Sequence, residues 1–286
     1  MDKKVGNKKR ILLFSIFKHI FLLGICFLLV YPVLYALFGA FKTNMDLTLG
    51  GRLLPEEWIF SNFYVALQQL DFLHFFVNSI FLAVSTTILS LLICSLTGFC
   101  LARKEFPGRK ILANTILATM FISIGTVTLR PIFVMMVGLN MHHTLIPVVL
   151  IIVSANMGTF IFLIEKFIRT VPKELDEAAY IDGASTFRIY WQVILPLILP
   201  ILGVVGLFSF RLAWNDFINT TVFTMSAPNL RTLTVGVVAL RHGMDSAAQW
   251  NIMLAGASLS IVPMLIVYLL TNKTFISGLA AGGVKG

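Results

Sequence analysis

Polar and ionisable side chains interrupt a long apolar run near residue 215. Arg211, Asn215 and Asn219 follow one another at intervals of four residues, and Asp216 is adjacent. On a continuous helix this spacing places the three side chains on one face. Two interpretations fit the stripe. It lines a path for a polar solute, or Asp216 neutralises Arg211 while the asparagines join helices by hydrogen bonds.

Residues that would carry out a reaction are not recognisable in the chain. It has no string of the form GxxxxGK followed by Ser or Thr, the loop that cradles nucleotide phosphates. His142 and His143 are typical of a solvated pair at a turn rather than a metal site. Cys26, Cys94 and Cys100 lack the spacing of zinc ligands. We therefore expect a chain that is not an enzyme and binds no cofactor or metal itself.

The composition predicts an integral membrane protein. Of 286 residues, 58% are hydrophobic and 12% are charged, and the mean hydropathy is +0.90. So few charged side chains cannot cover the surface of a soluble domain of this length. The formal net charge of +9 does not point to nucleic acid, because the basic residues gather at the ends of apolar runs. That pattern orients spans in a membrane.

Six runs are long and apolar enough to cross the roughly 30 Å hydrocarbon core of a bilayer as helices. We expect an all-α fold with a single transmembrane domain over residues 20–276, between tails at 1–19 and 277–286. The third and fifth runs contain charges, so their limits are the least certain. The predicted spans are Ile20–Phe41, Phe75–Leu101, Ile111–Val137, Thr144–Ile164, Val193–Phe223 and Ile252–Leu270.

Lysine and arginine residues predict the orientation of these spans. They gather in the N-terminal tail, in the loop after the second span and in the segment after the fourth. The loops on the other side carry only Lys42, Arg52, Arg231 and Arg241. Because cytoplasmic loops are enriched in these residues, both termini are expected in the cytoplasm. The first span lacks a signal-peptide cleavage site and is expected to stay in the mature protein.

A charged segment between the fourth and fifth spans, about 172–192, is predicted to form two short cytoplasmic helices. Pro172 suits the first turn of a helix, and nearby acidic residues favour its positive end. Gly183 can adopt a positive φ and end that helix, and Ser185 can cap the next one. Pro196 then marks the start of the fifth span. A short exposed helix pair needs a partner to hold it, and a soluble partner is the simplest explanation.

This segment resembles the cytoplasmic signature of permease subunits of bacterial ATP-binding cassette importers. The signature is EAA, three residues, Gly, nine residues, Ile, one residue and Leu-Pro. Val193, in the place of Ile, is the only departure. The other matching residues are Glu177, Ala178, Ala179, Gly183, Leu195 and Pro196.

Further strings are similar to the carbohydrate branch of these importers, the maltose-type inner-membrane subunit. They are IDGAS at 181–185, WNDF at 214–217 and GLAAGGVKG at 278–286. The resemblance covers all six predicted spans. It implies a type I importer permease fold in a bacterial plasma membrane, with carbohydrate as the imported solute. The same cytoplasmic signature occurs in importers of other solutes, which leaves a non-sugar substrate as an alternative.

The resemblance also implies partners and a coupling role. The two short helices would dock in a groove of a separate ATPase, a homodimer or heterodimer that binds ATP and Mg²⁺. A second homologous permease and an extracellular solute-binding protein would complete the importer. Glu177 would pair with a basic residue of the ATPase. The alternative for Glu177 is an intrahelical pair with Lys173, which contributes only about 0.3–0.5 kcal/mol.

Arg130 adds a hypothesis about the solute, because arginine is unexpected within the third span. Two arginines, Arg130 and Arg211, would bind the carboxylates of an acidic sugar through bidentate hydrogen bonds. A proton- or sodium-driven transporter is the alternative from another class. It would show internal repeats and buried carboxylates, and Asp216 alone supports it.

Overall fold

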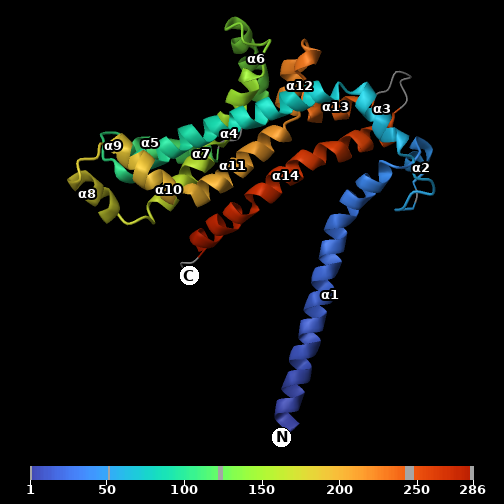
Figure 1. The fold of residues 1–286 in the computed structure, drawn as a ribbon, viewed down its shortest axis with the longest axis horizontal. Coiled ribbons are helices and arrows are strands. Elements are labelled where there is room, and N and C mark those ends of the chain that lie inside the picture. Colours follow the sequence, from blue (N-terminus) through green and yellow to red (C-terminus); the bar gives the residue numbers. More distant parts are fainter. Residues whose placement is uncertain (1, 51, 122–124, 242–247, 284–286) are drawn as a thin grey trace. The chain divides into compact units, whose positions relative to one another are not determined.

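The computed structural model describes residues 2–50, 52–121, 125–241 and 248–283, and side chains between residues 14 and 271 within these ranges. The regular elements over this part of the chain are helices, in agreement with the expected all-α class (Figure 1). Hydropathy explains this, because backbone groups within a bilayer are satisfied inside each helix. The α-helices are α1 (Asp2–Gly39), α2 (Asn44–Thr48), α3 (Ser61–Gln69), α4 (Phe72–Arg103), α5 (Arg109–Thr119), α6 (Leu129–Gly138), α7 (Ile146–Ile168), α8 (Glu174–Ile181), α9 (Thr186–Ile189), α10 (Leu195–Leu197), α11 (Leu199–Trp214), α12 (Ile218–Thr224), α13 (Leu233–Ala239) and α14 (Trp250–Gly283).

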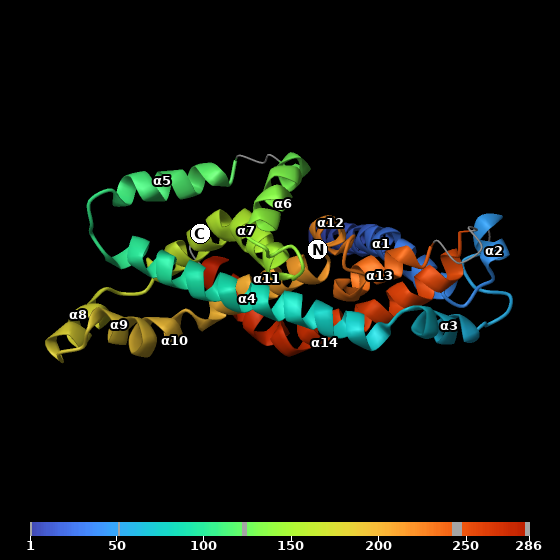
Figure 2. The ribbon, with the colours of Figure 1, turned by 90° about the horizontal axis from the view of Figure 1, so that it is seen from above.

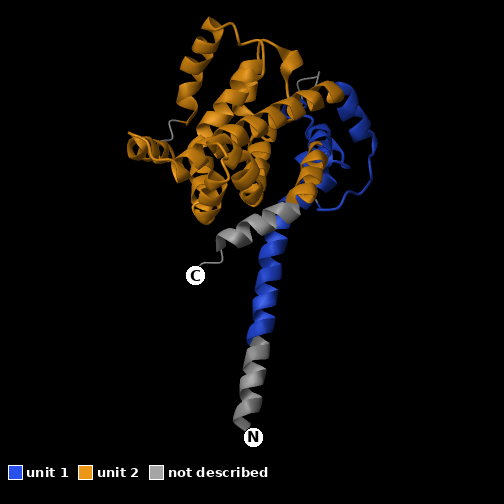
Figure 3. Cartoon of the chain, turned by 60° about the vertical axis from the view of Figure 1, so that its left-hand side comes forward, with its two compact units in different colours: residues 1–70, 237–259 blue, residues 71–236, 260–286 orange. Residues whose placement is uncertain are grey.

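Three further turns complete the set: the 3₁₀ turns η1 (Gly125–Thr128) and η3 (Pro228–Leu230), and the π-helical turn η2 (Tyr190–Ile194). The chain divides into two compact units, coloured in Figure 3. One contains residues 1–70 and 237–259, and the other contains 71–236 and 260–286. The predicted domain limits at residues 20 and 276 fall inside α1 and α14, and they stay predictions.

The first unit is organised around two buried or half-buried asparagines. Asn62 donates hydrogen bonds to the carbonyl oxygens of Ala40 and Lys42, both at 2.9 Å, and its own amide oxygen accepts one from Asn251 at 3.0 Å. Asn44 accepts a hydrogen bond from the backbone N–H of Trp250 at 2.9 Å. These amides satisfy the backbone between α1 and α3, where the helical hydrogen bonds stop.

The second unit is built on α4, α7 and α11, which lie side by side in Figures 1 and 2. Gly98 of α4 lets α7 approach closely, since a β-carbon there would lie 3.0 Å from Ile164 and 3.2 Å from the backbone nitrogen of Glu165. Small residues at helix contacts allow such packing in membranes. α8 and α9 lie beyond the C-terminal end of α4, and α6 and α12 lie away from that end.

Four of the expected spans correspond to single long apolar helices over the described residues. These are Phe14–Gly39, Phe72–Arg103, Ile146–Ile168 and Trp250–Thr271. The third and fifth expected spans are not continuous helices. The structure therefore confirms four of the expected spans as single helices, and six crossings stay a prediction.

The fifth expected span is bent by 79° between residues 186–197 and α11. Pro196 and Pro200 lie on either side of Ile198, where the helix is interrupted, and neither proline has an N–H to donate to the preceding turn. A second break follows at Asn215, and α12 begins at Ile218. Hydropathy alone does not detect these breaks. The residues at the first break are apolar, and the second break contains only two polar residues, Asn215 and Asp216.

The third expected span is divided between two helices that are too short to cross a bilayer alone. α5 ends at Thr119, and η1 with α6 covers Gly125–Gly138, while residues 122–124 lie outside the described part. Gly125 has a φ of 61°, which breaks helical geometry at that point.

Candidate functional site

The segment after α7 forms two helices joined by a tight turn, as the sequence predicts. α8 ends at Ile181, and Gly183 has a φ of 76°, a left-handed conformation that glycine adopts without strain. The Ser185 hydroxyl accepts a hydrogen bond from the backbone N–H of Arg188 at 3.3 Å and caps α9. We call residues 174–189 the bent element.

The outward surface of the bent element carries large apolar side chains. Ile181 is 88% exposed and Phe187 is 65% exposed, and Leu175 is exposed as well. Ala179 is half-buried and packs against the core of the second unit. Several large apolar side chains exposed on one short element are typical of a contact site.

The signature residues divide between this surface and the core. Glu177 and Ala178 are exposed beside the apolar side chains, and Gly183 is exposed at the turn. Leu195 is half-buried against the core, and Pro196 is exposed at the bend before α11. Within the described residues no ion pair joins Glu177 to Lys173, so the exposed carboxylate is not engaged by the alternative intrahelical partner.

Two residues at the end of α4 hold the bent element, and the sequence analysis did not select them. Arg103 Nε lies 2.7 Å from Asp176 Oδ2 on α8, and both side chains are largely buried. Lys104 Nζ donates hydrogen bonds to the Tyr180 hydroxyl and, at 2.9 Å, to Thr186 Oγ1. In the sequence this basic pair indicates only orientation, because no signal near it points to a partner on α8.

Burial and hydrogen bonding shift two pKa values in this contact. Burial raises the pKa of the Asp176 carboxyl above its usual value, and the Arg103 guanidinium beside it acts in the opposite direction. The hydrogen bond from Lys104, followed by that from Thr186, lowers the pKa of Tyr180. Both shifts arise at the junction between α4 and the bent element.

The polar residues of the fifth expected span line a second region, a hollow of about 980 Å³. Arg211, Asn215, Asp216 and Asn219 all line it, but α11 ends at Trp214, so they do not form a stripe on one helix. The break between α11 and α12 brings them together instead. Five hydroxyl side chains also line it, together with apolar residues such as Leu129, Ile132 and Ile151; the hydroxyl residues are Thr119, Thr126, Thr128, Ser154 and Thr159.

Asp216 does not pair with Arg211 in the described part of the chain. Its Oδ2 accepts a hydrogen bond from Asn219 at 2.6 Å, and its Oδ1 accepts two at 2.8 Å, from the backbone N–H and the hydroxyl of Thr220. Asp216 therefore anchors the first turn of α12. The Arg211 guanidinium lies over the ring of Phe208, 5.6 Å from its centroid.

Arg130 does not line this hollow, although its neighbours Leu129 and Ile132 do. It is an exposed residue of α6. The structure thus brings together four of the five residues predicted for a solute path and leaves Arg130 outside.

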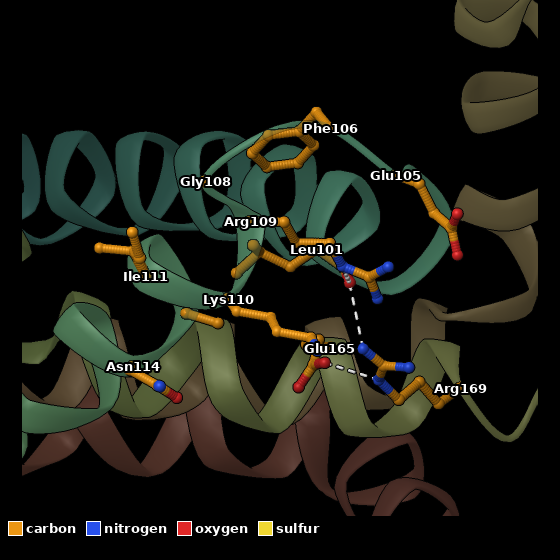
Figure 4. A pocket seen from close by; sticks show the side chains of 11 residues that line it. Leu101, Glu105, Phe106, Gly108, Arg109, Lys110, Ile111, Asn114, Glu165 and Arg169 are labelled. Carbon is orange, nitrogen blue, oxygen red and sulfur yellow. Dashed lines mark hydrogen bonds and ion pairs between the residues drawn. The ribbon is translucent and has the colours of Figure 1, made fainter.

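A third region is a hollow of about 760 Å³ lined by the connection between α4 and α5, by α5 and by α7 (Figure 4). Arg169 donates to Glu165 Oε1 at 2.6 Å and to the carbonyl of Leu101 at 3.1 Å, and Arg109 donates to the same carbonyl at 3.0 Å. These arginines close the end of α4 rather than point freely into the hollow.

Comparison with known proteins agrees with the sequence resemblance. A putative ABC transporter permease protein of Caldicellulosiruptor sp. is 35% identical over 258 residues, covering 89% of this chain and 91% of that protein. An arabinooligosaccharides transport system permease protein of Halalkalibacterium halodurans is 30% identical over 266 residues, covering 92% and 93%. These relatives are named as transport components and not as enzymes.

The fold also has a counterpart among solved structures. A chain in the crystal structure of a bacterial ABC transporter involved in the import of the acidic polysaccharide alginate superposes with a TM-score of 0.77. The two are 23% identical, and the match covers 92% of this chain and 96% of that one. Residues 10–273 match the family described as the binding-protein-dependent transport system inner membrane component. This chain is a multi-pass membrane protein and belongs to that family.

Proposed function

We propose that this chain is the permease subunit of an ATP-driven importer of oligosaccharides. The observation that carries the proposal is the bent element, which presents exposed apolar side chains while being fastened from behind to the end of a long apolar helix. A soluble partner bound to this surface could displace the bent element, and the contact with α4 would transmit that displacement to the spans. The chain has no nucleotide-binding loop of its own, so the energy must come from that partner.

The bent element is the proposed ATPase contact. Ala178 and the exposed apolar residues would enter a groove of the ATPase, and Glu177 would pair with a basic residue there. Gly183 gives the element its turn, and Leu195 and Pro196 connect it to the bend before α11. ATP and Mg²⁺ would bind to the ATPase chains. Closure of the ATPase would then displace the bent element and change the access of the spans.

The hollow beside α11 and α12 is the proposed solute path. Its amide, hydroxyl, carboxylate and guanidinium groups suit the many hydroxyl groups of a carbohydrate, each of which donates and accepts hydrogen bonds. Polar side chains at this depth cost free energy in a bilayer, so they normally face a path or a bundle interior. The arabinooligosaccharide relative supports a carbohydrate over another solute.

The proposed topology has six crossings with both termini in the cytoplasm. Four long helices supply four crossings, the bent pair ending in α11 supplies a fifth, and the segment from α5 to α6 supplies the sixth. Lysine and arginine enrichment on the side of the bent element supports this orientation. A second homologous permease would complete the path, and an extracellular solute-binding protein would deliver the sugar. The proposed location is the bacterial plasma membrane.

Reconstitution tests the proposal directly. The chain is produced with its neighbouring permease, ATPase and binding-protein genes, and the complex is placed in proteoliposomes. We expect uptake of labelled arabinooligosaccharide or maltodextrin that requires ATP and the binding protein, and no uptake of an amino acid. Uptake driven by a proton or sodium gradient without the ATPase would contradict the proposal, and so would a preference for the amino acid.

A further inference from the structure

A buried ion pair connects the bent element to the spans. Arg103 is the last residue of α4, and Asp176 lies in the first turns of α8. Their side chains are 5% and 11% exposed, and the joining atoms are 2.7 Å apart. Arg103 Nη2 also donates to the carbonyl of Val171 at 2.8 Å. One guanidinium thus holds both α8 and the chain that leads into it.

An exposed contact reinforces this pair from the adjacent residue. Lys104 reaches Tyr180 on α8 and Thr186 on α9, and these two hydroxyls lie 3.0 Å apart. The contact therefore bridges the turn at Gly183. Two consecutive residues at the end of α4 thus hold the bent element: Arg103 contacts α8 in the interior, and Lys104 contacts both α8 and α9 at the surface.

The apolar packing of α8 does not explain why the pair is needed. Leu175 and Ile181 face outward, and Ala179 is the small apolar residue of α8 that packs on the core. Burying two charges removes them from water, and a well-packed apolar contact often holds two elements as firmly. Arg103 instead meets Asp176 through Nε and the Val171 carbonyl through Nη2, so one side chain fixes two points of the segment. Two fixed points restrict rotation of α8 relative to α4.

The place of the pair connects the two candidate regions of the second unit. α4 packs along α7 and α11, and both of these helices contribute to the hollow that contains Arg211 and Asp216. A displacement of α8 that is passed to Arg103 acts on the end of α4. Because α4 packs against α7 and α11, this displacement can be transmitted to the residues that line the hollow.

We propose that Arg103 and Asp176 are positioning residues that transmit motion of the bent element to α4, and so couple ATP hydrolysis to solute movement. The inference rests on the proposed function. It assigns a specific task to a pair that would otherwise serve only to stabilise the fold. Neither residue lines the hollow that contains Arg211, and both side chains are buried within the described residues, so loss of the pair should uncouple the importer rather than disassemble it.

The test uses the complete transporter in proteoliposomes and compares Asp176→Asn, Arg103→Gln and the exchanged pair Arg103→Asp with Asp176→Arg. Three quantities are measured: ATPase recovered with the permease, ATP hydrolysed, and oligosaccharide imported per ATP. We expect each single variant to retain the ATPase and to lower import per ATP by about tenfold. The exchanged pair restores a charge contact across the same gap and should recover part of the loss.

Glu56→Gln is the control. Glu56 pairs with Arg52 at 3.1 Å in the connection between α2 and α3, and both side chains are exposed, so this pair joins no two helices. We expect its import per ATP to equal that of the unchanged protein. Asp176→Glu retains the charge and provides a second, milder variant should Asp176→Asn fail to fold.

Three results would overturn the inference while the proposed function stands. In the first, hydrolysis and import fall together in proportion to assembled complex, which would show a structural role alone. In the second, the exchanged pair is no better than the single variants. If the unchanged complex imports no oligosaccharide, the proposed function is contradicted and this inference falls with it. Import by the unchanged complex with normal import per ATP in Asp176→Asn contradicts this inference alone.

Discussion

Two regions of the second unit have similar backbone structure but expose opposite kinds of side chain. The bent element and the junction of α11 with α12 are both short helices separated by a break. At the bent element a charged pair is buried and large apolar side chains are exposed. At the junction Asp216 bonds to its own helix, and polar side chains face a hollow. The first surface suits a protein partner, and the second suits a hydrated solute.

The same substitution in both regions is the strongest test of this contrast. Ile181→Asp places a charge at the most exposed of the large apolar side chains of the bent element. We expect the ATPase recovered with the permease to fall by more than about tenfold, because central apolar residues dominate protein contacts. Met225→Asp, at an exposed residue that follows α12, is the control and should leave recovery unchanged. Equal losses in both variants would remove the distinction between the regions.

Substitutions of Arg211 and Arg130 compare a residue that lines the hollow with one that lies outside it. Arg211→Gln should lower uptake of an acidic oligosaccharide by about tenfold more than uptake of a neutral one, because a hydrogen bond to a charged group is lost. Arg130→Gln should change neither, since Arg130 lies outside the hollow. The measurement is initial uptake in proteoliposomes at equal protein content. Equal losses for both glycans in Arg211→Gln would contradict an acidic preference.

A smaller effect is expected from the turn of the bent element. Gly183→Ala meets no neighbouring atom within 4 Å, so its cost comes from the φ of 76° alone. A left-handed residue with a side chain costs about 1 kcal/mol, which should reduce ATPase recovery about fivefold. Asn tolerates this conformation better than most residues, so Gly183→Asn should be milder than Gly183→Ala. Equal recovery in Gly183→Ala and the unchanged protein would show that the turn adapts.

The smallest effect concerns Tyr180. Because the hydrogen bond from Lys104 lowers the pKa of Tyr180, the tyrosinate forms at a lower pH than it would without Lys104. Lys104→Met should therefore move this ionisation to higher pH. The measurement is the near-ultraviolet absorbance of tyrosinate during a pH titration, with Tyr180→Phe subtracted to isolate the one residue. An unchanged midpoint would show that Lys104 does not engage Tyr180.

Local signals in the sequence predict the bent element well. Gly183 and Ser185 act through their own backbone and side chain, and the structure has the turn and the cap at those residues. Hydropathy also predicts the four long helices, because each is a property of one continuous run. Features that depend on a single stretch of chain were accessible without a structure.

Features that depend on distant residues were not. Arg103 was counted as one of several positive charges, and nothing in its neighbourhood indicates that Asp176 would be its partner. The stripe at Arg211, Asn215 and Asn219 was predicted on one helix, but the helix ends at Trp214 and the hollow arises from the break. Periodicity gives the face of a helix only while the helix continues.

The π-helical turn at Tyr190–Ile194 lies within the signature, between Gly183 and Leu195, so the number of residues there affects the direction of α11. Leu195 donates its backbone hydrogen bond to the carbonyl of Tyr190, five residues back, so the turn takes up one residue more than an α-helical turn. Each residue of an α-helix advances the chain by roughly 100° around its axis. Because α11 leaves residues 186–197 at an angle of 79°, removing one residue here would swing α11 around the axis of that segment by about 100° and move it away from α4 and α7. The number of residues from Gly183 to Leu195 thus sets the direction in which α11 leaves the bent element.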